Sequence, residues 1–140
     1  MDALGPYTYT YFGKGFEKDS SILWQNFKKN ILEIKQVSTE LNTKFVFLIS
    51  PISLQLENHN KTNKLNYDVN CSTKNPRQYL INFLQENDIN FVDPLDLFKK
   101  YEKKYKLFHN YDVNHPNKLG HELIAKSIFN SPFIKIHFEY

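Results

Sequence analysis

The chain has few cysteines and no long apolar stretch, which disulfide-bonded, cysteine-ligated or membrane-spanning proteins require. Cys71 is its one cysteine in 140 residues, so no disulfide can close within the chain and no paired-cysteine metal site is possible. No apolar stretch approaches the length of a membrane span, and the first residues lack the charged start and apolar run of a signal peptide. These absences predict a soluble chain and leave its compartment open.

An excess of charge of one sign is also lacking. The chain has 18 Lys and Arg against 15 Asp and Glu, and its net charge is +3. The densest basic segment, Lys99–Lys106, interleaves lysines with tyrosines. We interpret it as a solvated helix face whose apolar side, Leu97, Phe98, Tyr101 and Tyr105, turns inward. The sequence therefore indicates no nucleic-acid partner.

What the chain does have is the composition of an ordered globular protein. It is 41% hydrophobic, 24% charged and 16% aromatic, unlike a disordered tail. Its length suffices for one domain with a core. We therefore predict a single α/β domain over residues 1–140.

The first half of the chain predicts a helix followed by a buried strand. The helix is expected from Asp19 or Ser20 to about Leu41, with an apolar stripe at helical spacing formed by Leu23, Phe27, Ile31, Ile34 and Leu41. Residues 42–44 turn the chain into the uninterrupted apolar run 45–49, which is typical of a parallel strand covered on both faces. Before the helix, Tyr7–Phe12 favours a strand or an extended entry segment.

The second half predicts three more helices and a short strand. Pro76 opens a helix to about Asn87, 89–93 is the strand, and Pro94 opens a helix to about Lys104. Asn117 caps the last helix. The inward residues of the first of these helices are expected to be Tyr79, Leu80, Phe83 and Leu84, and those of the last Leu119, Leu123, Ile124, Ile128 and Phe129.

Two remaining segments are less regular. The polar stretch 54–75 is longer than most connections in compact domains, and we expect it over the rim of a site. The tail 133–140 alternates apolar and polar residues, which predicts an edge strand or an extension packed on the body.

This order of elements predicts the fold class. Alternating helices and strands imply a parallel sheet with right-handed crossovers and helices on both faces, a three-layer α/β sandwich. Functional sites in such sheets lie beyond the carboxyl ends of the strands. Ser50, Asp93 and the loop 112–115 can all reach that edge.

Asp112 and His115 are the candidate catalytic residues. They stand three positions apart, directly before the last predicted helix. Pro116 biases His115 away from helix and into a loop. A hydrogen bond from one imidazole nitrogen to the Asp112 carboxylate would fix the tautomer of the ring, and the other nitrogen would then take a proton from a nucleophile.

The segment Asp112-x-x-His115-Pro116-Asn117-x-x-Gly120-His121, with Leu123-Ile124-Ala125 after it, resembles the last conserved block of the SGNH (GDSL-like) hydrolases. The resemblance implies a flavodoxin-like three-layer sandwich and ester hydrolysis, as by an esterase, lipase or deacetylase. It also implies that Asp112 and His115 belong to a Ser-His-Asp triad. The substrate would be a small-molecule, glycan or lipid ester, and no cofactor or metal would be needed.

The resemblance covers only the later half of such a domain. The chain contains no Gly-Asp-Ser and no Gly-x-Asn-Asp, and its four glycines are Gly5, Gly13, Gly15 and Gly120. The segments that carry the nucleophile and the oxyanion hole in that family are thus missing. We expect the domain to be incomplete at its N-terminus and the chain by itself to be inactive.

Three alternatives remain open. Ser50 or Ser53 could act as nucleophile, although neither stands in a Gly-x-Ser-x-Gly elbow. His109, Asp112, His115 and His121 could supply ligands to a transition metal. Asp112 and His115 could instead be structural residues of a non-catalytic interaction module. Neither the substrate nor the oligomeric state follows from the sequence.

Overall fold

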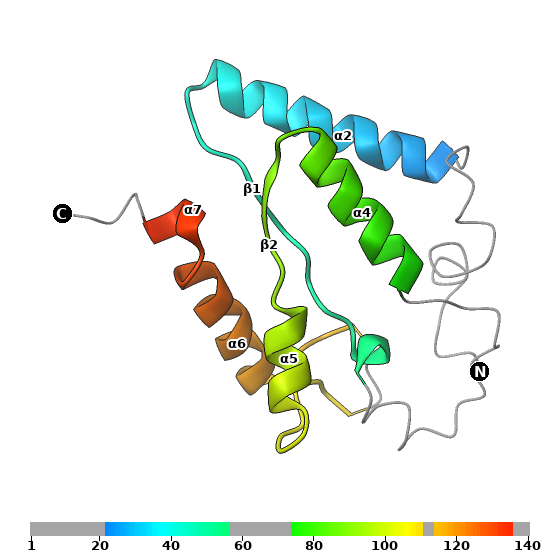
Figure 1. Ribbon diagram of the computed structural model, residues 1–140, viewed down its shortest axis with the longest axis vertical. Helices are drawn as coiled ribbons and strands as arrows, with labels where there is room; N and C mark the ends of the chain where they lie inside the picture. The colour runs from blue at the N-terminus through cyan, green and yellow to red at the C-terminus, as the bar shows by residue number, and fades with distance from the viewer. Residues whose placement is uncertain (1–21, 57–73, 111–113, 136–140) are drawn as a thin grey trace. The chain divides into compact units, whose positions relative to one another are not determined.

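Along the described part of the chain, helices alternate with two strands as far as α5 (Leu95–Tyr101), and two more helices follow it (Figure 1). The structure is a computed structural model that describes residues 22–56, 74–110 and 114–135. Its elements are α2 (Ile22–Glu40), β1 (Val46–Leu48), the 3-10 helix η2 (Ser53–Gln55), α4 (Lys74–Glu86), β2 (Asn90–Val92), α5 (Leu95–Tyr101), α6 (Lys118–Phe129) and α7 (Pro132–Lys135). The described residues thus combine helices with a small parallel sheet, which agrees with the predicted α/β class. The predicted strand Tyr7–Phe12 and residues 57–73 of the polar stretch lie outside the described residues.

Strands β1 and β2 form a parallel sheet, as predicted. Val46 lies opposite Asn90, and Leu48 lies opposite Val92. The Ile49 N–H continues the ladder with a 2.9 Å bond to the Val92 carbonyl. Helix α4 lies between the two strands in sequence, which is the kind of connection that parallel strands need. Leu48 is 38% exposed, so the expectation that this strand is covered on both faces is wrong at that residue.

Helices α2 and α4, which each precede a strand, end with the same type of C-terminal cap. Asn42 and Asp88 follow α2 and α4 with φ of 52° and 49°, a left-handed conformation that Asn and Asp tolerate better than most residues. After α2, the Thr43 N–H donates to the Ser38 carbonyl at 2.8 Å, and after α4 the Ile89 N–H donates to the Leu84 carbonyl at 2.9 Å. These are Schellman caps. They end each helix a few residues before the strand that follows it.

Two compact units divide the described residues, and the first combines 22–45 with 74–89. Its core centres on Trp24, which stacks on Phe27 with ring centroids 5.4 Å apart and meets Phe83 edge-on at 6.1 Å. The face of α2 that carries Trp24 and Ile31 is buried, whereas Ile34 and Leu41 are exposed. The predicted stripe is therefore wrong for Ile34 and Leu41, because packing of the large Trp24 ring turns a different side of α2 inward.

The inward face predicted for α4 is mostly correct. Phe83 and Leu84 are buried, Leu80 is half-buried and Tyr79 is exposed. The prediction is wrong for Tyr79.

The second unit contains 46–56, 90–110 and 114–135. Its core cluster consists of Leu56, Leu95, Phe98, Leu107, Phe108 and Leu123, with Leu97, Tyr101, Leu119 and Ile124 packed against it. Leu56 therefore belongs to the core, and that end of the stretch 54–75 is not a rim loop. The lysines of Lys99–Lys106 are exposed as expected. Tyr105 and Phe129 are exposed as well, so their predicted burial is wrong.

Several elements differ from the prediction. Helix α4 begins at Lys74, two residues before Pro76. Helix α5 ends at Tyr101, because the Lys104 and Tyr105 N–H groups both donate to the Tyr101 carbonyl at 3.0 Å and close a turn. The start of the tail is the short helix α7 and not an edge strand. Pro132 is its first residue, a position where the φ of proline suits a helix. Residues 136–140 lie outside the described part.

Across the described ranges, no helix combines the length and the apolar character needed to cross a membrane.

Candidate functional site

His115 lies at the C-terminal end of a loop whose two ends are paired. Phe108 and Pro116 form an antiparallel bridge. On one side of the bridge, the His109 N–H donates to the His115 carbonyl at 3.2 Å. On the other side, the Asn117 N–H donates to the Leu107 carbonyl at 2.9 Å. These backbone contacts hold the ends of the loop together immediately before α6.

The side chain of His115 is exposed. Helix α6 begins at Lys118, after Pro116 and Asn117, so the placement of His115 in a loop before the last helix is confirmed. Asp112 lies outside the described residues, in the interval 111–113. The hydrogen bond between Asp112 and His115 therefore stays a prediction.

Asn117 caps α6, as the sequence predicted. Its side-chain Oδ1 accepts a 3.0 Å hydrogen bond from the Gly120 N–H. Its Nδ2 donates a 2.7 Å bond to the Lys106 carbonyl, on the opposite side of the loop. Asn117 thus contacts both the first turn of α6 and the segment that enters the loop.

Gly120 brings the first turn of α6 close to the same segment. A Cβ at this position would lie 2.4 Å from the Leu107 carbonyl oxygen and 2.6 Å from the Pro116 Cβ. Both Pro116 and Gly120 are buried. The base of the loop is consequently packed against the helix by direct contact as well as by hydrogen bonds.

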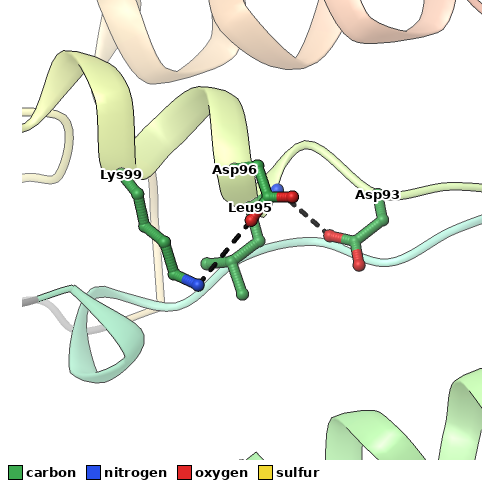
Figure 2. A network of polar contacts seen from close by, with 4 residues as sticks. All are labelled: Asp93, Leu95, Asp96 and Lys99. Carbon is green, nitrogen blue, oxygen red and sulfur yellow. Dashed lines mark hydrogen bonds and ion pairs between the residues drawn. The ribbon is translucent and has the colours of Figure 1, made fainter.

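Ser50 and Asp93 follow the paired strands at their carboxyl ends, where the sequence placed them. Ser50 is exposed. The Asp93 Oδ1 accepts a 3.0 Å hydrogen bond from the Leu95 N–H at the start of α5 (Figure 2). This bond gives Asp93 a structural role in the turn from β2 into the helix.

Ser53 is placed differently from Ser50. It is the first residue of η2, is 2% exposed, and its Oγ makes no hydrogen bond within the described part of the chain. A hydroxyl this deeply buried is out of reach of a substrate in solution. Of the two serines considered as alternative nucleophiles, Ser50 alone is accessible.

Replacing Asp93 with alanine is expected to destabilise the protein by about 1 kcal/mol, because the Leu95 N–H loses its side-chain acceptor. The matched control is Asp96→Ala. Asp96 has a side chain that is 92% exposed and lies 3.7 Å from the Lys99 ammonium (Figure 2), so its loss should change stability by less than about 0.5 kcal/mol. Urea unfolding monitored by circular dichroism measures both. Equal effects of the two substitutions would contradict the structural role of Asp93.

The histidines do not gather into a metal site in the part of the chain that is described. His109, His115 and His121 all have exposed side chains. No group of three or more His, Cys, Asp or Glu residues among residues 22–56, 74–110 and 114–135 could hold a metal ion. Asp112, the fourth ligand considered, lies outside these ranges.

Comparison of the chain with protein-family models, with curated proteins and with solved structures found no match.

Two features of the site were missed by sequence reasoning. The bond from Asn117 to the Lys106 carbonyl joins residues eleven positions apart, and the contact of Gly120 with Leu107 depends on how the loop folds back. The glycine inside an otherwise helical pattern was the available signal, because such a glycine often marks a close packing contact.

Proposed function

We propose that this chain supplies the acid and the base, Asp112 and His115, of a Ser-His-Asp ester hydrolase of the SGNH type. The supporting observation is the setting of His115: an exposed imidazole at the end of a loop that is fastened to the first turn of α6. A general base needs both access to its substrate and a fixed position. The serine and the oxyanion hole would come from a polypeptide segment that this sequence does not contain.

The chemistry assigns one role to each residue. Asp112 accepts a hydrogen bond from one ring nitrogen of His115 and stabilises the imidazolium. The other ring nitrogen takes the proton of the serine hydroxyl while the serine oxygen attacks the ester carbonyl. The proton then passes to the leaving alcohol. In the second half of the reaction His115 takes a proton from water, which attacks the acyl-serine. The bond between the acyl group and the serine oxygen breaks, the proton returns from His115 to that oxygen, and the acid is released.

The proposed architecture is a three-layer sandwich in which β1 and β2 are two strands of a wider parallel sheet. Parallel sheets occur almost always with both faces covered by helices, yet Leu48 of β1 is 38% exposed. The described part contains two strands, so each has an edge to which a further strand could pair. A preceding half-domain with its own strands and helices would fit these features.

The first test asks whether Asp112 orients His115. In a long-range proton–nitrogen NMR spectrum of the labelled chain at mildly alkaline pH, where an ordinary histidine is neutral, we expect two clearly unequal ring nitrogens, one protonated and one not. Asp112→Asn should move these signals toward the average of the two tautomers. The substitution His115→Gln assigns the signals by removing them.

The internal control for this experiment is His121, which lies on α6 and should be unaffected by Asp112→Asn. Averaged ring nitrogens at His115 in the unmodified chain would count against the proposal. So would a His115 spectrum that does not respond to Asp112→Asn.

The second test uses the genomic DNA upstream of the Met1 codon. We expect it to encode an apolar strand followed by Gly-Asp-Ser. A polypeptide that includes this segment should hydrolyse p-nitrophenyl acetate and lose that activity on His115→Gln, whereas the present chain should show no serine-dependent hydrolysis. If no such segment is encoded there, a non-catalytic interaction module becomes the better description.

A further inference from the structure

The side chain of Asn117 can make its two hydrogen bonds in only one orientation. The Gly120 N–H is a donor and requires the side-chain oxygen, and the Lys106 carbonyl is an acceptor and requires the side-chain NH₂ group. The two partners lie on different segments, one in the first turn of α6 and one at the entrance of the loop. One amide therefore fixes the spacing of the two segments.

Asn117 also contacts the segment that enters the loop through its backbone. Its side chain bonds the Lys106 carbonyl at 2.7 Å and its backbone N–H bonds the Leu107 carbonyl at 2.9 Å, so it holds two consecutive carbonyls. The remaining backbone bond, between His109 and His115, is 3.2 Å long. Asn117 is thus an anchor of the loop.

Only Pro116 separates this anchor from His115. The ring of Pro116 fixes its own φ, and Pro116 is bridged to Phe108. The chain between the anchor and His115 consequently has few soft dihedral angles. We therefore expect a change in how Asn117 holds Lys106 to reach the backbone of His115.

We infer that Asn117 is a positioning residue for His115, with its NH₂ group holding the loop and its oxygen capping the helix. This inference rests on the proposed function, since it assigns a second support to the same base. If Asn117 were only a helix cap, its oxygen would matter and its NH₂ group would not affect His115.

The test uses Asn117→Asp, which preserves the shape of the side chain and the oxygen that caps Gly120 but removes the donor to the Lys106 carbonyl. A second variant, Asn117→Ser, also keeps a good capping oxygen and adds no charge. In both, the amide signals of α6 should stay as in the unmodified chain. The ring nitrogens of His115 should shift toward the average of the two tautomers.

The outcomes separate this inference from the proposed function. Averaged His115 nitrogens already in the unmodified chain would contradict the proposed function itself. Unequal nitrogens that stay unchanged in both variants would overturn the role of Asn117 alone. If Asn117→Asp disturbs α6, then Asn117→Ser decides: an intact α6 with an unchanged His115 spectrum refutes the inference, and an intact α6 with averaged nitrogens supports it.

Discussion

Replacing Phe98 with alanine is expected to destabilise the protein by about 3 to 5 kcal/mol, the cost of removing a fully buried aromatic side chain from a packed core. Phe98 has 0% exposure and belongs to the cluster that joins α5 to α6. Its ring centroid lies 5.7 Å from that of Phe108. A small domain has only about 5 to 15 kcal/mol of stability in total, so the variant should lose a large part of it.

Urea unfolding monitored by circular dichroism measures this effect, with Phe129→Ala as the matched control. Phe129 is also a helical phenylalanine but is 69% exposed, so its loss should cost less than about 0.5 kcal/mol. Because Phe108 forms the bridge with Pro116, the amide signals of residues 107–109 should shift in Phe98→Ala. Similar stability losses in the two variants would show that this core is incorrectly assigned.

Gly120→Ala is expected to destabilise the protein by about 1 to 3 kcal/mol, the usual cost of forcing extra atoms into a packed site. The added methyl group would meet the Leu107 carbonyl oxygen at 2.4 Å and Pro116 at 2.6 Å. The carbonyl is backbone, and it is held by the Asn117 N–H. Neither contact can be relieved by rotating a flexible side chain.

The direction of this effect is opposite to that of helix propensity, which favours alanine over glycine by about 1 kcal/mol. The control is therefore a pair of variants at Glu122, an exposed position of the same helix. There, alanine should be more stable than glycine by about 1 kcal/mol. If Gly120→Ala raises the urea midpoint, as alanine does relative to glycine at position 122, the proposed close contact of α6 with the loop is wrong.

Local chemistry explains why the element boundaries were largely predictable. Asn42 lies where the sequence placed a turn, because its side chain tolerates a left-handed conformation that ends a helix. The Asn117 cap was also predictable, since a short acceptor side chain before an apolar helix satisfies the first backbone N–H groups. In both cases a few neighbouring residues contain all the atoms involved.

Helix orientation was less predictable for a physical reason. In α2, Ile31 belongs both to the predicted stripe with Ile34 and to the buried side with Trp24, and these two apolar sides differ by a fraction of a turn. Hydrophobic periodicity shows that such a helix is amphipathic. Which of two apolar sides is buried depends on the partner, here Phe83 of α4 against Trp24.

The sequence by itself determined the α/β class, the parallel pairing implied by alternating helices and strands, and the position of His115 before the last helix. Spacing and turn chemistry decide these features within a few residues. Only the tertiary structure decided that Gly120 and Asn117 fasten the loop to α6, because Lys106 and Leu107 reach them through folding and not through proximity along the chain. Contacts between distant residues depend on packing in three dimensions, which no local pattern encodes.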